Sequence, residues 1–262
     1  TLERLSYNYE QFIKNDEDLP LFDEMLYETV KRWNKPLFTG EIGKTYVVKN
    51  KKFIRQHFNN GALISSDGKL IKSYSKIHLV PFGEWFPYSK TFPFLVPLLE
   101  SMQASKFTPG EKPSLFKLDG KKFGALICYE GIFHRLCRKY KQMGADYLIN
   151  ITNDGWSDSF AGHMQHYTAS VFRALENGIW YVRVGNTGRS GVIDPFGRLI
   201  KEMPMLEPGS MTADLDFRLN RTTIYEKIGD LILYIAVLFL LFVTTLYIKN
   251  EIFGRKQKKQ MQ

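Results

Sequence analysis

Apolar positions recur along the chain with two spacings, one typical of buried strands and one typical of amphipathic helices. Short apolar runs predict strands at residues 36–40, 47–48, 62–64, 70–74, 123–127, 145–151 and 179–184. Helices are predicted at residues 21–33, 131–143 and 163–177, and Gly178 is placed to end the last of them. Strands that alternate with helices indicate a layered α/β fold or an α-β-β-α arrangement.

Two hairpins are predicted where turn residues separate short strands. Ser66-Asp67-Gly68 lies between residues 62–64 and 70–74, and Asp-Gly is the strongest short hairpin signal. The turn at 194–197 joins residues 190–193 to residues 198–200 in the same way. Hairpins interspersed among strand–helix units fit the same layered α/β architecture.

One apolar segment near the C-terminus differs in kind from these elements. Residues 231–248 form an uncharged run whose length suits a membrane-spanning helix, and a buried core helix is the alternative. Five basic residues and one acidic residue in the following tail give it a net charge of +4. The positive-inside rule then places residues 249–262 in the cytoplasm of a bacterium and residues 1–230 on the periplasmic side of the inner membrane.

Composition and charge narrow the functional classes. The formal net charge is +9, but no long basic stripe interleaved with aromatic residues is present, so nucleic acid is a poor candidate partner. Cys128 and Cys137 are the two cysteines of the chain, too few for a disulfide scaffold. The chain begins at Thr1 and has no signal peptide, and we expect it to be a fragment or a processed product.

Two stretches carry candidate chemistry. Cys128 ends the apolar run 123–127, at the edge where α/β sheets present reactive groups to a crevice. By itself, this pattern is more typical of a small core cysteine. The second stretch, residues 74–85, crowds Lys76, His78 and Glu84 together, and its proline and glycine prevent regular structure. A solvated lysine–glutamate pair with a structural histidine is the alternative interpretation.

Other polar residues have simpler interpretations. Arg173 and Glu176 are spaced to form an ion pair on one helix, and Asn153 and Asp154 are typical of a turn. A metal site is not predicted, because His163 and His166 lie three residues apart without an evident third ligand. Cys137 is predicted to be a helix residue. Residues 91–109 form an apolar loop that could pack internally or meet lipid.

Several long motifs resemble the nitrilase, or carbon–nitrogen hydrolase, superfamily, and within it the bacterial apolipoprotein N-acyltransferases. The similarity covers residues 36–250 and is carried, in the family's order, by YSKIHLVPFGEWFP, GALICYEGIF, NITNDGWSDS, QHYTASVFRALENGIWYVRVGNTGRSGVIDPFGR and TTIYEKIGD. The resemblance implies a nitrilase-like α-β-β-α sandwich over residues 1–230, followed by a transmembrane helix and a cytoplasmic tail. It implies no cofactor and no metal.

The resemblance also implies a reaction and a set of site residues. An acyl chain would pass from a membrane phospholipid to the N-terminal diacylglyceryl-cysteine of a lipoprotein through a cysteine thioester. Cys128 would be the nucleophile and Lys76 the lysine of a Glu-Lys-Cys triad. Glu84 and Glu130 match further family glutamates near the site and are expected to be catalytic, and Tyr129 and Trp156 match family residues expected to bind substrate.

One departure from the family pattern concerns the general-base glutamate. The family carries it in a Trp-Pro-Glu-like motif at the end of an early strand, and this sequence has no such motif. Glu10 is at a tolerable distance but follows no buried strand, and Glu41 follows the wrong strand. We expect the glutamate, the first strands and several membrane helices to precede Thr1, so that this fragment alone would be inactive.

Two other functions stay open at this point. A membrane-tethered amidase or nitrile hydrolase of the same superfamily would share the triad and use water as the second acceptor. A catalytically inactive, membrane-anchored binding domain would explain the missing glutamate differently. The glutamate-containing lysine segment and the terminal apolar helix favour the acyltransferase.

Overall fold

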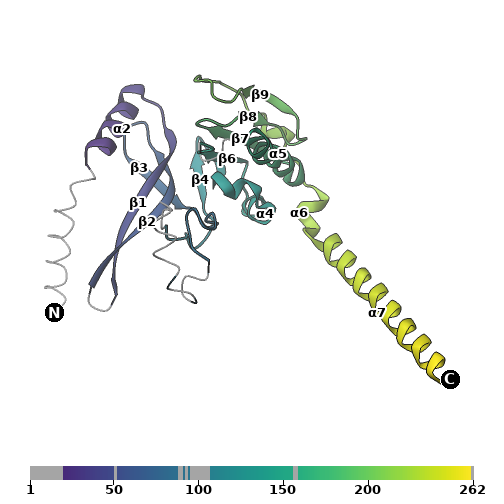
Figure 1. The fold of residues 1–262 in the computed structure, drawn as a ribbon. Coiled ribbons are helices and arrows are strands. Elements are labelled where there is room, and N and C mark those ends of the chain that lie inside the picture. Colours follow the sequence, from purple (N-terminus) through teal and green to yellow (C-terminus); the bar gives the residue numbers. More distant parts are fainter. Residues whose placement is uncertain are drawn as a thin grey trace. The chain divides into compact units, whose positions relative to one another are not determined.

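The computed structural model describes residues 20–49, 52–87, 91, 94, 107–155 and 159–260 (Figure 1). The chain divides into two compact units, Thr1–Arg221 and Thr222–Gln262. The first unit contains two β-sheets with helices, and the second is helical.

A three-stranded antiparallel sheet forms the first part of unit 1. Its strands are β1 (Leu37–Lys49), β2 (Lys52–Ile64) and β3 (Leu70–Ser75), paired in that order. The hairpin predicted at residues 66–68 is confirmed, and Gly68 has a φ of 77° there. Helix α2 (Pro20–Trp33) lies against this hairpin, since a Cβ on Gly68 would meet Lys31 at 2.7 Å. The predicted helix at 21–33 is therefore also confirmed.

Strands β1 and β2 are much longer than the sequence pattern predicts. Thirteen residues of each strand pair continuously, from Leu37 opposite Ile64 to Lys49 opposite Lys52. The apolar runs predicted only residues 36–40, 47–48 and 62–64, because the middle of both strands is polar. Backbone hydrogen bonds between neighbouring strands do not require apolar side chains, so this part of the ladder leaves no apolar signal.

A six-stranded mixed sheet forms the second part of unit 1. Its order is β4 (Leu115–Leu118), β5 (Lys121–Ile127), β6 (Tyr147–Thr152), β7 (Trp180–Gly185), β8 (Ser190–Ile193) and β9 (Leu199–Met203). The central strands β5, β6 and β7 are parallel, and the outer pairs are antiparallel. Helices α4 (His134–Gln142) and α5 (Phe160–Asn177) connect the parallel strands. Gly178 ends α5 in the left-handed conformation, as predicted.

The predicted helix at residues 131–143 begins later than expected. Residues Cys128–Ile132 instead form a 3₁₀ turn, η2, and α4 starts at His134. The buried Glu130 side chain accepts the backbone N–H of Ile127, which ties this turn to the end of β5. A local hydrogen bond thus replaces the first helical turn that the sequence suggested.

Two hydrophobic cores lie on opposite faces of the six-stranded sheet. On one face, α4 and α5 cover Leu126, Leu148 and Tyr181. On the other face, Phe123 packs with Leu63 and Tyr74 of the three-stranded sheet. Helices, the six-stranded sheet and the three-stranded sheet therefore form successive layers. The predicted layered α/β fold is confirmed.

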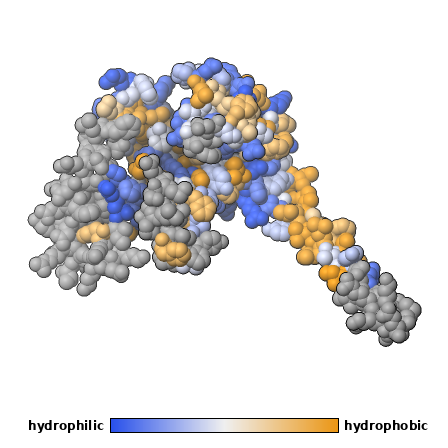
Figure 2. Space-filling view, in the orientation of Figure 1, coloured by the Kyte–Doolittle hydropathy of each residue, from blue (hydrophilic) through white to orange (hydrophobic). Residues whose placement is uncertain are grey.

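Unit 2 consists of the short helix α6 (Ile224–Ile228) and the long helix α7 (Leu231–Gln260). Residues Leu231–Asn250 of α7 are long and apolar enough to cross a membrane, and none of this span is buried within the protein. Its continuous apolar surface is visible in Figure 2. The helix continues beyond the predicted end at residue 248 and includes most of the basic tail, because lysine, arginine and glutamine favour helix as well.

Phe123 should be one of the residues on which the stability of unit 1 depends. Its ring is fully buried and stacks on Phe116 with centroids 4.9 Å apart. Phe123→Ala should lower the free energy of unfolding by about 3–5 kcal/mol, because it removes a large core side chain and leaves a cavity. Denaturant unfolding followed by circular dichroism measures this change. Phe172→Ala, whose ring is 51% exposed, is the control, and equal losses for both variants would contradict the assignment.

Candidate active site

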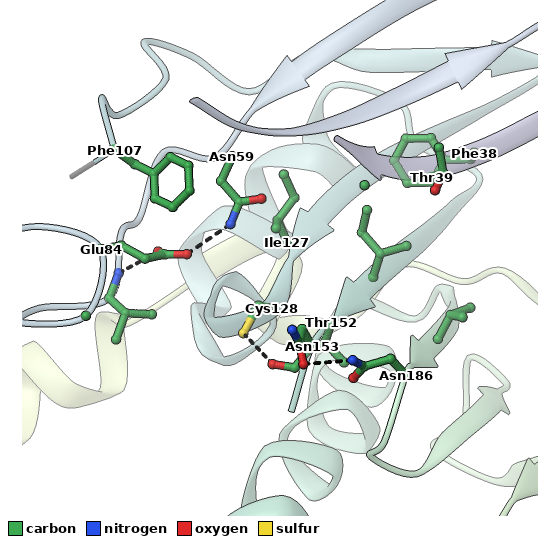
Figure 3. Close-up of a pocket in the computed structure, with 16 residues that line it drawn as sticks. Phe38, Thr39, Asn59, Glu84, Phe107, Ile127, Cys128, Thr152, Asn153 and Asn186 are labelled. Carbon is green, nitrogen blue, oxygen red and sulfur yellow. Dashed lines mark hydrogen bonds between the residues drawn. The ribbon is translucent and has the colours of Figure 1, made fainter. Parts of the chain in front are cut away.

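A cavity of about 740 Å³ opens where the parallel strands of the six-stranded sheet end. Strands β5, β6 and β7 each contribute residues from their carboxyl ends, which is the usual place for ligands in α/β sheets. Strands β1 and β2 and the connection between β3 and β4 supply the other lining residues (Figure 3). The lining residues are Phe38, Thr39, Gly40, Asn59, Val80, Gly83, Glu84, Phe107, Ile127, Cys128, Ile151, Thr152, Asn153, Val184, Gly185 and Asn186.

Cys128 lies at the end of β5, where the chain turns abruptly into η2. Its φ is 49°, in the left-handed region that residues with a side chain seldom adopt. A conformation of this kind costs on the order of 1–3 kcal/mol and is found mainly at functional sites. The half-buried thiol is at the cavity, with Sγ 3.9 Å from the backbone carbonyl of Asn153 (Figure 3). The predicted nucleophile thus occupies a sharp, strained turn.

Lys76 and Glu84 form a buried ion pair beside the same cavity. Lys76 follows β3 and is fully buried, and its Nζ lies 2.7 Å from Glu84 Oε2 and 3.0 Å from Oε1. Asn59 Nδ2 and the Val80 backbone N–H each donate a hydrogen bond of 2.9 Å to the same carboxylate (Figure 3). Burial makes the charge of Lys76 depend on this partner, since an unpaired buried ammonium would be very costly.

The loop that contains Glu84 turns tightly so that its carboxylate faces inward. Phe82 has a φ of 64°, and its N–H donates to the carbonyl of Trp85. The N–H of Glu84 in turn donates to the Val80 carbonyl at 2.9 Å. The proline and glycine that excluded a regular helix or strand from the prediction therefore lie in a compact turn. This turn directs the Glu84 side chain inward.

Glu130 is fully buried and accepts four hydrogen bonds. Its Oε1 receives the Tyr74 hydroxyl at 2.8 Å and the backbone N–H groups of Ile77 and His78 at 2.7 and 3.1 Å. Its Oε2 receives the Ile127 N–H at 2.9 Å. Burial raises the pKa of Glu130, and the hydrogen bonds oppose that shift. The carboxylate joins the segment that carries Lys76 to the strand that carries Cys128.

The structure places the other predicted site residues differently. The ring of Tyr129 packs edge-on against Phe133, 5.1 Å between centroids, and Tyr129 is not among the described residues that line the cavity. His78 stacks on the same Phe133 at 4.2 Å, and burial lowers its pKa, which fits a structural role. Trp156, Glu10 and most of the apolar loop at residues 91–109 lie outside the described residues.

Glu41, the other weak candidate for a general base, faces its own sheet. Its carboxylate accepts hydrogen bonds from Ser73 Oγ at 3.0 Å and Asn60 Nδ2 at 3.4 Å. Among the described residues that line the cavity, Glu84 is the one carboxylate, and it is already bound by Lys76. The described part of the chain therefore does not identify the general base.

Polar residues that the sequence suggested were structural have defined partners. Arg173 Nη2 lies 2.8 Å from Glu176 Oε1, which confirms the predicted ion pair. Asn153 accepts the Gly155 N–H at 3.0 Å, the Asx-type bond expected of the predicted turn. Asn59 and Asn186 line the cavity although the sequence did not suggest them as site residues. An isolated asparagine in a strand or turn carries no functional signal of its own.

Comparison with known proteins agrees with this architecture. Residues 7–225 match the family model described as carbon-nitrogen hydrolase. Apolipoprotein N-acyltransferases are among the curated relatives. That of Borreliella burgdorferi is 34% identical over 71% of this chain and 36% of its own length. That of Rickettsia prowazekii is 32% identical over 87% of this chain and 45% of its own length. The chain thus spans less than half of either relative.

A solved structure shares the fold. The amidase from Nesterenkonia sp. superposes with a TM-score of 0.52 at 22% identity, covering 71% of this chain and 63% of the amidase. The family match extends over more than four fifths of the chain and includes both sheets and the cavity residues. The chain belongs to the carbon–nitrogen hydrolase family, and its sandwich is the nitrilase-like fold that the motifs predicted.

Replacing the buried Glu130 carboxylate should destabilise the protein, because its hydrogen bonds join the two segments of the site. Glu130→Gln places an NH₂ group where a carboxylate oxygen now receives an N–H, so at least one buried donor is left without an acceptor. We expect a loss of about 1–3 kcal/mol in the free energy of unfolding. Thermal unfolding measures it, with the exposed Glu111→Gln as the control. An unchanged midpoint for Glu130→Gln would show that these hydrogen bonds do not hold the two segments.

Proposed function

We propose that the protein transfers a fatty acyl chain from a membrane phospholipid to the amino group of the N-terminal diacylglyceryl-cysteine of a lipoprotein, through a thioester on Cys128. The observation that carries this proposal is the position of Cys128. It is a strained thiol at a 740 Å³ cavity whose wall includes Glu84, the ion-pair partner of the buried Lys76. The names of the curated relatives supply the substrate class.

A thiol suits both halves of an acyl transfer. In the first step, Cys128 Sγ attacks the ester carbonyl carbon of the phospholipid, a C–S bond forms and the C–O bond breaks. The glycerol oxygen leaves with a proton as the lysophospholipid. In the second step, the lipoprotein amine attacks the thioester, a C–N bond forms and the C–S bond breaks, which regenerates the thiol. Splitting one difficult displacement into two easier steps is the advantage of covalent catalysis.

Lys76 and Glu84 are proposed to supply the electrostatic environment for both steps. A cation beside the cavity stabilises the oxyanion that develops at the acyl carbon. Glu84 holds the Lys76 ammonium by two short contacts and is itself fixed by Asn59 and Val80. The charge is therefore oriented before the substrate arrives, so little reorganisation is needed in the transition state.

The remaining roles follow the family resemblance. Glu130 is proposed to act by positioning Lys76 and Cys128, whereas Tyr129 and Trp156 are proposed to contact substrate. A glutamate outside the described residues would take the proton from the thiol and later from the acceptor amine.

Membrane association is supported by the apolar span of α7. Both substrates carry acyl chains and reside in the bilayer, so an anchored enzyme meets them at high local concentration. The basic residues after the span favour a cytoplasmic tail, which would place unit 1 on the periplasmic side of the bacterial inner membrane. Unit 1 would then work on the face of the membrane where exported lipoproteins arrive.

Incubating the full-length protein with phospholipid should produce a covalent acyl adduct on Cys128. Intact-mass analysis should show one added acyl mass that hydroxylamine removes, because thioesters are labile to it. Cys128→Ala should show no adduct. Cys137→Ala is the matched control, since Cys137 lies on the buried face of α4 and should not react.

The same experiment separates the competing functions. An adduct that forms from a simple amide but not from phospholipid would replace the acyltransferase by an amidase. No adduct from either substrate in a folded wild-type protein would favour an inactive binding domain. An adduct that persists in Cys128→Ala would place the nucleophile elsewhere.

Glu84→Gln should separate the electrostatic role from folding. Removing the negative charge leaves the Lys76 ammonium buried without its partner, and we expect kcat for acyl transfer to fall about 10²–10³-fold. Steady-state kinetics with a lipopeptide acceptor measures this change, and thermal unfolding shows whether the variant is folded. The exposed Glu111→Gln is the control. Full activity of a folded Glu84→Gln protein would exclude the proposed role of this pair.

A further inference from the structure

A buried polar network contacts the backbone of Cys128. Asp154 and Arg183 are almost completely buried and joined by an ion pair of 2.6 Å between Oδ2 and Nη2. His166, on α5, lies 3.0 Å from Asp154 through Nδ1. The structure does not include these three residues among those that line the cavity, so their burial needs an explanation other than direct contact with substrate.

The network ends on the backbone of the proposed nucleophile. His166 Nε2 lies 3.0 Å from the carbonyl oxygen of Cys128, and Asn150 Nδ2 lies 3.2 Å from the same oxygen. A carbonyl can only accept, so Nε2 of His166 is the donor. Asn150 is in turn held by Arg183, whose Nη1 donates to its Oδ1 at 2.8 Å. The Arg183 guanidinium thus contacts both residues that donate to the Cys128 carbonyl, Asn150 and His166.

The ion pair between Asp154 and Arg183 stabilises the network. Burial alone would raise the pKa of Asp154, but the hydrogen bond from His166 and the charge of Arg183 lower it to about 2. Asp154 is therefore ionised near neutral pH, with Oδ1 lying 3.0 Å from His166 Nδ1. Thr152 Oγ1 donates a further hydrogen bond of 2.9 Å to the same carboxylate. Thr152 and Arg183 thus both donate to this carboxylate, which orients it firmly.

The neighbouring turn is shaped to admit Asp154. A Cβ at Gly188 would lie 1.9 Å from Asp154 Oδ2, far inside contact distance, so only glycine fits. Asn186 Oδ1 also accepts the backbone N–H of Asp154 at 3.2 Å. The turn after β7 and the turn after β6 are thus packed around one carboxylate.

The network can stabilise the strained backbone conformation of Cys128. A residue at φ 49° tends to relax toward negative φ, and such a rotation would move both its carbonyl and its side chain. Two hydrogen bonds on the carbonyl oppose that rotation. They therefore also set the direction of the Cα–Cβ bond and the place of Sγ at the cavity.

We infer that His166, oriented by Asp154 and Arg183, is a positioning residue that holds the Cys128 backbone in the conformation required for acyl transfer. This inference rests on the proposed function of Cys128 as the nucleophile. His166 is not itself the base for the thiol, because Nε2 is engaged by the Cys128 carbonyl, and Nδ1 faces Asp154 and, at 3.2 Å, Arg183. Neither nitrogen is directed to Sγ.

A pair of substitutions at one position tests the inference. Glutamine can place its Nε2 donor near the position of the histidine Nε2, whereas asparagine reaches only as far as Nδ1. His166→Gln should therefore keep the bond to the Cys128 carbonyl, and His166→Asn should lose it. Gln165→Asn, on the exposed face of the same helix, is the control for introducing asparagine into α5.

Two measurements on the full-length protein in detergent report the effect. The first is the rate of alkylation of Cys128 by iodoacetamide, followed by intact mass. Cys137 does not compete, because burial raises the pKa of its thiol to about 12. The second is the steady-state kinetics of acyl transfer from phospholipid to a lipopeptide. Displacing a reacting group by about 1 Å can cost on the order of 100-fold in rate.

We expect His166→Asn to lower kcat about 100-fold with KM for phospholipid unchanged, and to lower the alkylation rate about tenfold. His166→Gln should retain both rates within about threefold, and Gln165→Asn should match wild type. Equal losses in folded His166→Gln and His166→Asn, or wild-type rates in His166→Asn, would overturn the inference. A loss of more than tenfold in folded His166→Gln alone would also overturn it, so the test stands even where the asparagine variant fails to fold.

Alkylation also keeps this test separate from the proposed function. The reaction with iodoacetamide requires only an oriented, reactive thiol and no acyl substrate. If wild type forms no acyl adduct, the acyltransferase proposal fails, and the difference in alkylation between the two variants still decides whether His166 positions Cys128.

Discussion

The hydrogen bonds to the buried Glu130 carboxylate are the interaction on which the candidate site depends. Lys76 and Cys128 lie 52 positions apart in the sequence, and each directly follows a strand of a different sheet. Glu130 spans that separation, because it accepts backbone N–H groups that follow Lys76 and the one that precedes Cys128. Removing such a carboxylate from water is costly, and the cost is offset only while all of its donors are present. The two halves of the site are therefore held together cooperatively.

The residues with a strained backbone conformation are also the ones that neighbouring hydrogen bonds hold in place. Cys128 and Phe82 both have positive φ, and each begins or shapes a turn that presents a side chain to the cavity: the Cys128 thiol and the Glu84 carboxylate. Such conformations persist only where neighbouring bonds over-determine them. For Cys128, these bonds are the donors to its carbonyl and the adjoining contacts of Glu130. The turn is thus rigid, which suits the proposed role of Cys128 as a nucleophile that meets its substrate in one geometry.

The distribution of charge separates two environments within unit 1. Toward the cavity, a cation is paired with a carboxylate on the wall. A second ion pair, between Arg183 and Asp154, is sealed from solvent. Both pairs bind further polar groups, so their desolvation is compensated by hydrogen bonds rather than by Coulomb attraction alone. The helical unit has a different chemistry, because α7 exposes an apolar surface of membrane-spanning length and has no comparable polar network in its apolar span.

The sequence by itself determined the layered α/β fold, most of the helices, both hairpins, the apolar span and the residues most typical of a reactive centre. Those features arise from local periodicity, turn residues and motif order, and these signals depend on residues that are close together in the sequence. Only the tertiary structure decided the full length of β1 and β2, the 3₁₀ turn at Cys128, and the placement of Tyr129 against Phe133. It also showed that His166, which the sequence suggested only as an unlikely metal ligand, contacts the backbone carbonyl of Cys128. These outcomes depend on backbone pairing and buried hydrogen bonds between residues far apart in the chain, and such contacts leave no periodic signal in the sequence.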